Sequence, residues 1–526
     1  MSSARRFTGI IAARGFAEGP VAELGGAVAR YVPSGDASRE ATTLRAALAM
    51  ASAQLSGLMA LASADAADML EFQLAMLEDE SLSQPAFDAI VAATDASTAW
   101  GNALEVQIAI YDAAKDDYFR ARAADLRDIH DRVSRALSGA VDTRPPAGAI
   151  LTGDDITPSQ FLAADWSKGG AIVLRRGSAA SHVAMLARAR GVPMLIGVAD
   201  LRAGSTIVGL VDAATAGSIE LDPDSAARAD FNARRATNDK AMHEAIATLA
   251  TPAISADGSA IAVSVNIAEP TDVDSVDITH CDGVGLMRTE FLYSSCLPSE
   301  ETQYRAYARV LDWAGGKPVT IRTVDAGGDK PVAGFTVEEA NPFLGLRGIR
   351  LALAKPDIFR VQIRALLRAQ ALGDLRIMFP MVTVIGEFAA AAALFADEAG
   401  RLGVPVPPLG IMIEVPATAI SPELFAGVAF FSIGSNDLTQ YVMAAARDNA
   451  AVAALNDPTH PSVLRLIESA VRGAAALDIP ISLCGDAGGD PNSIDALLNT
   501  GLRSLSVAPA QLALAKRAVA AVTIRP

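Results

Sequence analysis

The residue with the clearest chemical potential is His182, one of only five histidines in the chain. It follows the small residues of 177–181 and opens an apolar helical pattern that runs to Ala189 and stops at Gly191. Ser181 is a suitable N-cap, so the imidazole would face the unpaired N–H groups of the first turn and the positive end of the helix dipole. Such a position can hold a phosphoryl group, although a surface histidine without chemistry is the commoner explanation of this stretch alone.

Arginines gather in the C-terminal half of the chain. Arg288 and Arg322 lie at the ends of successive apolar segments, and Arg347 lies in the loop 341–350, which is rich in residues of restricted backbone geometry. Guanidinium groups bind phosphate and carboxylate through paired hydrogen bonds. A single arginine is usually a solvated surface charge. Three in such positions favour convergence on one anionic substrate.

Two carboxylates and a thiol follow neighbouring apolar segments. Glu414 and Asp437 would supply the hard oxygen ligands that magnesium uses together with a substrate phosphate. A buried carboxylate paired with an arginine is the alternative for Glu414. Cys484 carries a thiol whose ordinary pKa of about 8.5 keeps it protonated at neutral pH, so it can donate a proton. Most free cysteines are only small buried residues, and we assign that role to Cys281 and Cys296.

The elements that would position these groups alternate between short apolar strands and helical segments over residues 255–526. This pattern predicts a C-terminal (β/α)8 barrel of the TIM type, in which the active site lies at the C-terminal ends of the strands. The arginines, carboxylates and cysteine fall at such ends. The eight predicted strands are residues 262–267, 283–286, 319–324, 376–380, 410–414, 430–433, 481–484 and 504–507.

The sequence pattern of the N-terminal half predicts an α/β fold with more than one domain. Short strands with glycine and proline turns occupy residues 1–30 and 142–223, and the strand 170–174 leads directly to the loop of His182. We expect these two flanks to form one unit.

Residues 31–141, between the flanks, are poor in glycine and carry alanine and leucine at helical spacing. We expect an inserted helical bundle, in which Val106 and Ile110 mark one of the helices. Residues 224–254 are expected to form a linker helix because they are rich in alanine and mixed charge.

The composition of the chain limits the classes of function that it can have. A chain of 526 residues with 51% hydrophobic residues can build several cores. The net charge of −16 argues against a nucleic-acid partner. No apolar run is long enough to span a membrane, so we expect no membrane insertion. Three cysteines without metal-ligand spacing and no signal-peptide pattern favour a cytoplasmic location.

Taken together, the motifs closely resemble those of enzyme I of the phosphoenolpyruvate-dependent sugar phosphotransferase system, over nearly the whole chain. The segment 176–188 is similar to the family's phosphohistidine motif. The segments similar to its phosphoenolpyruvate-binding signatures are residues 283–293, 322–330 and 341–350, and those similar to its metal-binding signatures are residues 410–416 and 431–441.

The resemblance implies a swivelling phosphohistidine domain (1–30 and 142–223), an inserted bundle (31–141) that docks the phosphocarrier protein HPr, and a barrel (255–526) that forms a homodimer. It implies transfer of the phosphoryl group of phosphoenolpyruvate to the protein itself and then to HPr, with release of pyruvate. The implied site residues are His182 as nucleophile, Arg288, Arg322, Arg347, Arg447 and Asn436 for phosphoenolpyruvate, Glu414 and Asp437 for Mg²⁺, and Cys484 as the proton donor to the enolate.

The chain departs from the family pattern at several positions, among them Arg176, Ala180, Ala446 and Asp486. These departures leave open a protein that senses phosphoenolpyruvate without transferring its phosphoryl group, or a phosphotransferase of a regulatory branch. A phosphoenolpyruvate synthase or pyruvate phosphate dikinase would need a nucleotide-binding domain, and residues 31–140 contain no glycine-rich phosphate loop.

Overall fold

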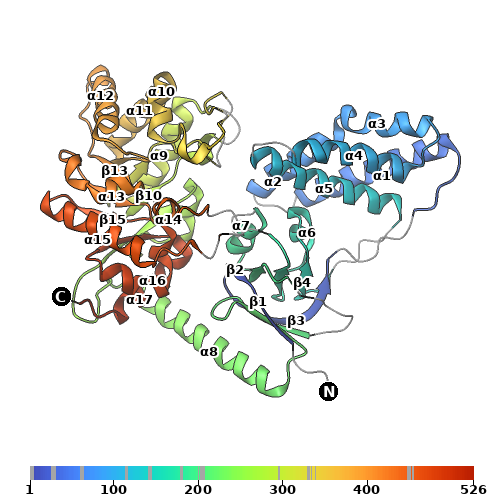
Figure 1. The fold of residues 1–526 in the computed structure, drawn as a ribbon, viewed down its shortest axis with the longest axis horizontal. Helices are drawn as coiled ribbons and strands as arrows, with labels where there is room; N and C mark the ends of the chain where they lie inside the picture. Colours follow the sequence, from blue (N-terminus) through green and yellow to red (C-terminus); the bar gives the residue numbers. More distant parts are fainter. Residues whose placement is uncertain are drawn as a thin grey trace. The chain divides into compact units, whose positions relative to one another are not determined.

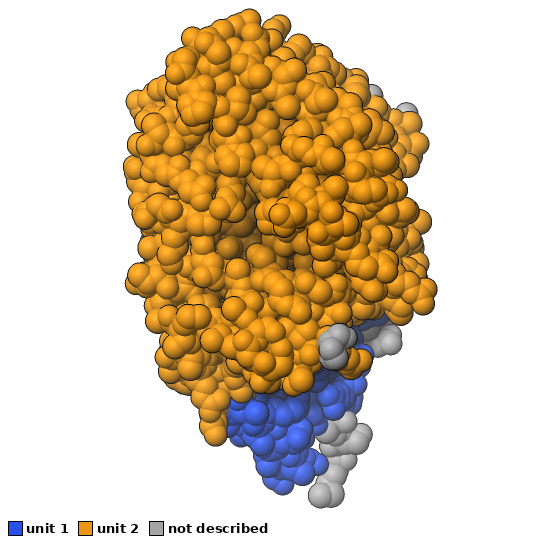
Figure 2. All heavy atoms as spheres, turned by 90° about the vertical axis from the view of Figure 1, so that its left-hand side faces the viewer, with its two compact units in different colours: residues 1–237 blue, residues 238–526 orange. Residues whose placement is uncertain are grey.

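A computed structural model divides the chain into two compact units, residues 1–237 and 238–526, each with its own hydrophobic core (Figure 2). Within the described chain, no helix combines the length and the apolar character that crossing a membrane requires. The described residues are 5–24, 31–59, 64–112, 117–139, 145–177, 182–199, 201, 208–293, 297–328, 332, 334–337, 339–446, 452 and 455–525.

The first unit contains an eight-stranded sheet of order β1-β8-β7-β3-β4-β5-β6-β2 (Figure 1). The edge strands β1 and β2 are consecutive in the chain and are separated by Gly9. A Cβ atom at Gly9 would lie 2.5 Å from the Val198 side chain and 2.6 Å from the Ile196 carbonyl oxygen, so this close approach needs glycine. The strands are β1 (Arg5–Thr8), β2 (Ile10–Ala13), β3 (Phe16–Glu23), β4 (Ile150–Gly153), β5 (Ala171–Leu174), β6 (Met194–Ile196), β7 (Val208–Asp212) and β8 (Ser218–Leu221).

Two short helices lie on this sheet. α6 (Pro158–Ala163) begins at the N-cap Thr157, whose hydroxyl accepts from the Gln160 N–H while the Gln160 side chain accepts from the Thr157 N–H, a capping box. α7 (His182–Ala189) ends before Gly191, which has a positive φ of 65°. The predicted end of the His182 helix is therefore confirmed, whereas its proposed cap Ser181 lies outside the described residues.

A bundle of five helices lies between β3 and β4 in the sequence, although these strands pair in parallel, with Val21 opposite Ile150. The expected inserted bundle is thus confirmed. Val106 and Ile110 lie in the helix α4, whose buried face is formed by Ala96, Trp100 and Leu104, whereas Val106 and Ile110 are exposed. The helices are α1 (Ala37–Met59), α2 (Ala64–Glu78), α3 (Glu80–Val91), α4 (Ala96–Asp112) and α5 (Asp117–Leu137).

A buried carboxylate fastens this bundle. Glu40 of α1 is 3% exposed and accepts hydrogen bonds from the Tyr31 hydroxyl (2.6 Å), from the N–H and hydroxyl of Ser34 (2.6 Å each) and from the Ala96 N–H that opens α4 (2.8 Å). Burial alone would raise the pKa of Glu40, but these donors outweigh it and lower the pKa to about 2. The charged carboxylate therefore holds the start of α4 against α1.

The second unit is a closed parallel barrel of order β10-β11-β12-β13-β14-β15-β16-β9, and the predicted barrel is confirmed. β11, β13 and β14 are buried at every residue, as expected when both faces are covered, although β11 and β14 also contain polar residues. They are β9 (Ala262–Ile267), β10 (Val284–Met287), β11 (Val319–Arg322), β12 (Leu375–Phe379), β13 (Leu409–Ile413), β14 (Phe431–Ile433), β15 (Ile481–Leu483) and β16 (Ser504–Val507).

Helices connect successive strands and cover the outside of the barrel (Figure 1). They are α9 (Glu300–Ala314), α10 (Ile349–Ala354), α11 (Pro356–Ala369), α12 (Ile385–Leu402), α13 (Pro416–Ile420), α14 (Ser435–Met443), α15 (Pro461–Ala476), α16 (Pro491–Leu498) and α17 (Leu512–Ala521). The predicted linker helix is observed as α8 (Ser225–Ala247).

We predict that Glu40→Gln weakens the bundle by about 2 kcal/mol, because an amide offers fewer acceptors to the same buried donors. The folded pKa of Glu40 lies below its unfolded value of about 4.3, so the contribution is complete above that value and is lost as the pH falls from about 4.5 to about 2. Hydrogen exchange in α1 and α4 at several pH values measures it. The exposed Glu80→Gln is the control, and an equal effect of both changes would contradict this assignment.

Candidate active site

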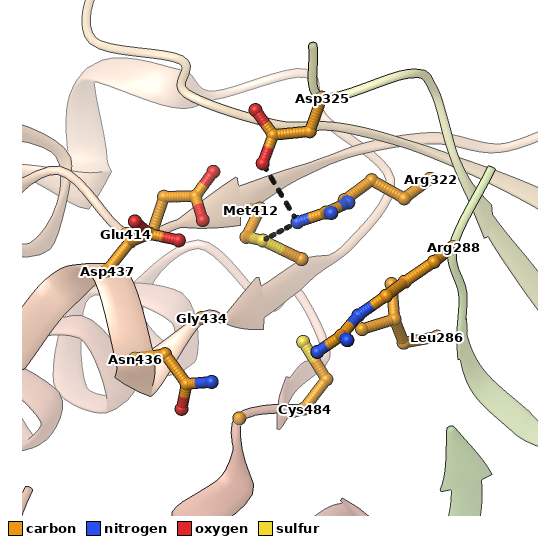
Figure 3. A pocket seen from close by; sticks show the side chains of 11 residues that line it. Leu286, Arg288, Arg322, Asp325, Met412, Glu414, Gly434, Asn436, Asp437 and Cys484 are labelled. Carbon is orange, nitrogen blue, oxygen red and sulfur yellow. Dashed lines mark hydrogen bonds and ion pairs between the residues drawn. The ribbon is translucent and has the colours of Figure 1, made fainter. Parts of the chain in front are cut away.

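A pocket with about 500 Å³ of empty space opens at the C-terminal ends of the barrel strands, as the sequence predicted. Figure 3 shows the side chains that project into it from β10, β11 and β13, from the residues that follow these strands and β15, and from the first turn of α14 (Ser435–Met443). The predicted residues that line it are Arg288, Arg322, Glu414, Asn436, Asp437 and Cys484, and the others are Leu286, Asp325, Met412, Gly434 and Gly485.

Arg322 is held rigidly in this pocket. Its Nη2 donates to Glu290 Oε1 (3.1 Å), and its Nη1 lies 3.3 Å from Asp325 Oδ2 and 3.6 Å from the Met412 sulfur. Glu290 Oε1 also accepts from the Asp325 N–H (3.0 Å), which fixes both carboxylates around the guanidinium. The buried Arg322 Nε has no hydrogen-bond partner within the described chain.

Arg288 reaches the same pocket from the end of β10, and its guanidinium lies near the Cys484 side chain in Figure 3. Arg347 lies differently from the expected convergence. Its side chain is 1% exposed and is bound between two carboxylates, with Nε and Nη2 each 3.0 Å from Asp325 oxygens, and Nη1 and Nη2 at 3.0 and 3.2 Å from Asp437 oxygens. Burial would lower the pKa of Arg347, but these two carboxylates outweigh it and raise the pKa.

The two predicted metal ligands lie side by side. Asp437 stands in the first turn of α14, and Glu414 follows β13, where its Oε1 accepts from the Met381 N–H (2.6 Å). Burial raises the pKa of Glu414 to about 8, and the neighbouring charges of Asp437 and Asp325 add to this effect. A Cβ atom at Gly434 would lie 2.9 Å from Glu414 Oε2, so glycine is needed to bring the two segments together.

This crowding of carboxyl groups suits a divalent cation. Carboxylate oxygens are the ligands that Mg²⁺ prefers, and a bound cation would relieve the repulsion among Glu414, Asp437 and Asp325. Across the described residues, no group of three or more His, Cys, Asp or Glu side chains is arranged to hold a metal ion. Glu414 and Asp437 therefore fit Mg²⁺ only as a pair that water and substrate oxygens complete, which is how Mg²⁺ usually binds.

Cys484 lies at the floor of the pocket, at the end of β15. Its N–H donates to the Ile433 carbonyl oxygen (3.0 Å), and its Sγ lies 3.6 Å from the same oxygen. It packs with the buried side chains of Leu286, Met378, Met412 and Phe430. Burial raises the pKa of the Cys484 thiol to about 11, so at neutral pH it carries its proton.

Asn436 is fixed at the rim by a residue that departs from the family pattern. Its Nδ2 donates to Asp486 Oδ2 (2.9 Å), and its Oδ1 accepts from the Asp486 N–H (3.0 Å). Asp486 therefore holds Asn436 through one side-chain and one backbone contact.

Sequence reasoning assigned no site role to Glu290, Asp325, Asp486 or Asn266. Asn266 of β9 donates to the carbonyl oxygens of Cys484 (3.0 Å) and Ser506 (3.2 Å), and so ties the Cys484 backbone to the barrel. A signal existed for Asn266, since it is an amide inside an apolar strand, and for Glu290 and Asp325, since both follow strand ends.

Several predicted residues remain without a structural account. The backbone of His182 begins α7, but its side chain lies outside the described residues, as do Arg447, Ala180 and Cys296. The strand β5 leads to Gly177, whose φ of 111° requires glycine, immediately before the His182 loop.

Comparison with known proteins agrees with this geometry. Three family profiles match, described as PEP-utilising enzyme, N-terminal (residues 8–122), PEP-utilising enzyme, mobile domain (145–217), and PEP-utilising enzyme, PEP-binding domain (243–524). The chain is therefore a multidomain enzyme of the phosphoenolpyruvate-utilising class.

Individual relatives identify the family within this class. The phosphoenolpyruvate-protein phosphotransferase of Staphylococcus carnosus (strain TM300) is 37% identical over 87% of this chain and 82% of that protein. The proteins of the same name from Enterococcus faecalis (strain ATCC 700802 / V583) and Geobacillus stearothermophilus are 38% and 36% identical, over 78% and 90% of this chain and 75% and 85% of those proteins. The chain belongs to the family of phosphoenolpyruvate-protein phosphotransferases.

The raised pKa of Cys484 predicts slow alkylation. At pH 8 only about one thiol in a thousand would be ionised, and the rate of reaction with iodoacetamide should rise about tenfold per pH unit until the pH approaches 11. Peptide mass spectrometry at the Cys484 peptide measures this rate, with free glutathione as the control. A rate that levels off near pH 8.5 would contradict the protonated thiol.

Proposed function

We propose that this protein transfers the phosphoryl group of phosphoenolpyruvate to its own His182 and then to a histidine phosphocarrier protein, HPr or a homologue, releasing pyruvate. This is the first step of the sugar phosphotransferase system. The observation that carries the proposal is the barrel pocket, where a buried guanidinium with one unpartnered N–H, a pair of carboxylates and a protonated thiol meet. Membership in the family of phosphoenolpyruvate-protein phosphotransferases supports it.

The chain's own residues supply the steps. Arg288 and Arg322 bind the phosphate, Arg447 and Arg347 add charge, and Asn436 donates to a phosphate oxygen from its position beside Asp486. Neutral His182 attacks phosphorus in line, and the N–P bond forms as the bond from phosphorus to the enol oxygen breaks. The enolate then takes a proton at C3 from the Cys484 Sγ, and the thiolate recovers a proton from solvent.

Glu414 and Asp437 would hold Mg²⁺ for this reaction. When bound, Mg²⁺ supplies positive charge to the phosphate and to the oxygen that becomes the enolate. The repulsion of the Glu414 carboxylate by Asp437 and Asp325 supports this assignment.

The partners follow from the same proposal. The phosphorylated His182 must meet both the barrel and HPr, so the phosphohistidine domain swings about linkers near residues 142–146 and 224–250. HPr docks on the inserted bundle, where Val106 and Ile110 offer exposed apolar surface.

The barrel forms a homodimer, and Ile420 and Leu424 are exposed apolar residues on its surface. A cytoplasmic location fits the free thiols of Cys281 and Cys484.

Incubation with radiolabelled phosphoenolpyruvate and Mg²⁺ should place an acid-labile label on the protein. His182→Ala should abolish the label, and the exposed His243→Ala should retain it. Added HPr should remove the label from the wild-type protein. Phosphoenolpyruvate binding without any label would contradict the proposal and favour a sensor.

Glu290→Gln should lower kcat/KM for phosphoenolpyruvate about tenfold, because Arg322 loses one of the two carboxylates that fix its orientation. Initial rates of pyruvate release measure the effect. Glu423→Gln, at an exposed position of the same unit, should leave the rate unchanged. A normal rate in Glu290→Gln would remove the positioning role of this carboxylate.

A further inference from the structure

The guanidinium of Arg347 is hydrogen-bonded to the carboxylate of Asp437, which is also a predicted metal ligand. Nη1 of Arg347 lies 3.0 Å from Asp437 Oδ1, and Nη2 lies 3.2 Å from Asp437 Oδ2, so both oxygens of Asp437 accept from one planar fork. The remaining Nε and Nη2 contacts go to Asp325 at 3.0 Å each. Arg347 thus already supplies the positive charge that Asp437 needs in the absence of a metal ion.

The environment of Arg347 makes this a well-defined bound position. The side chain is 1% exposed, its Nη1 donates to the Tyr441 hydroxyl (3.4 Å), and its guanidinium carbon lies 5.7 Å from the centre of the Phe343 ring. A divalent cation that binds Asp437 must share the carboxylate with a guanidinium whose nitrogens lie 3.0 and 3.2 Å from its two oxygens, and two cations on one buried carboxylate repel each other. Full occupation of Asp437 by both cations is therefore unfavourable.

We propose that Arg347 is the resident counter-ion of the metal-free site and competes directly with a divalent cation for Asp437. The substrate phosphate then offers Arg347 a replacement anion, so that cation and substrate each promote binding of the other. This inference rests on the proposed function for the identity of the substrate, but the competition for Asp437 rests only on the contacts of Arg347.

The local chain allows the guanidinium to change partners. Arg347 lies between η4 (Pro342–Leu344) and α10, with Gly345 and Gly348 on either side, and Gly348 has a positive φ of 57°. Asp325 lines the pocket and contacts Arg347 as well, so a guanidinium that leaves Asp437 keeps one carboxylate while it turns toward a bound phosphate. Such coupling between two ligands is reciprocal by thermodynamic linkage.

The experiment measures binding of Mn²⁺ alone, without substrate, by electron paramagnetic resonance of free Mn²⁺. Arg347→Met and Arg322→Met each remove one buried guanidinium from the same network, but the ion pairs of Arg322 are with Glu290 and Asp325, whereas those of Arg347 are with Asp325 and Asp437. We expect Arg347→Met to bind Mn²⁺ at least tenfold more tightly than Arg322→Met does. Equal gains in Mn²⁺ affinity in the two variants would show that only the net charge of the site matters. That result would overturn the proposal that Arg347 competes for Asp437.

A structural readout on the wild-type protein covers the case in which Arg347→Met fails to fold. In crystals of the full chain soaked with increasing Mn²⁺, located by its anomalous scattering, Arg347 should leave Asp437 as the metal site fills. Mn²⁺ bound at Asp437 with both Arg347 contacts retained would overturn the proposal. Because neither measurement contains phosphoenolpyruvate, the result is independent of whether His182 accepts a phosphoryl group.

Discussion

The active site depends on one buried chain of alternating charges. Glu290, Arg322, Asp325, Arg347 and Asp437 contact one another in that order, with nitrogen-to-oxygen distances between 3.0 and 3.3 Å. Buried ions are costly to remove from water, and each is retained here because it has opposite charges on its flanks. The order of charges fixes the Arg322 guanidinium at the pocket wall and leaves the carboxylates of Asp437 and Glu414 facing inward. A fixed Arg322 guanidinium favours electrostatic stabilisation of a transferring phosphoryl group, since this group needs little reorganisation during the reaction.

The same pocket separates two kinds of environment. Arginines and carboxylates form one wall, whereas Leu286, Met378, Met412 and Phe430 surround the Cys484 thiol at the floor. The apolar floor disfavours the thiolate and so keeps a proton available at Cys484. One cavity therefore provides a charged region for a phosphate and a protonated acid for a carbon atom. The charged wall and the protonated Cys484 thiol can function in one cavity because their surroundings differ over a short distance.

The sequence predicted the eight barrel strands to within two residues at each end, because buried parallel strands appear as short apolar runs between glycine and proline turns. Six site residues were found for a related reason, since strand ends are where barrel chemistry lies. The partners of Arg347 were not predictable, because a guanidinium beside two carboxylates has the same sequence pattern as one that faces a substrate. The apolar spacing identified the helix of Val106 and Ile110 but not which of its faces packs, and both residues are exposed.

The parallel pairing of β3 with β4 has a consequence for how the first unit folds. Val21 and Ile150 are neighbours in the sheet although the five helices of the bundle separate them along the chain. A flexible loop of that length would make this pairing entropically costly and slow. The bundle has its own hydrophobic core and is built largely from local contacts, so its early formation would shorten the effective loop and bring the two strands together. A bundle that formed first would thus act as a scaffold for the sheet that carries the His182 segment.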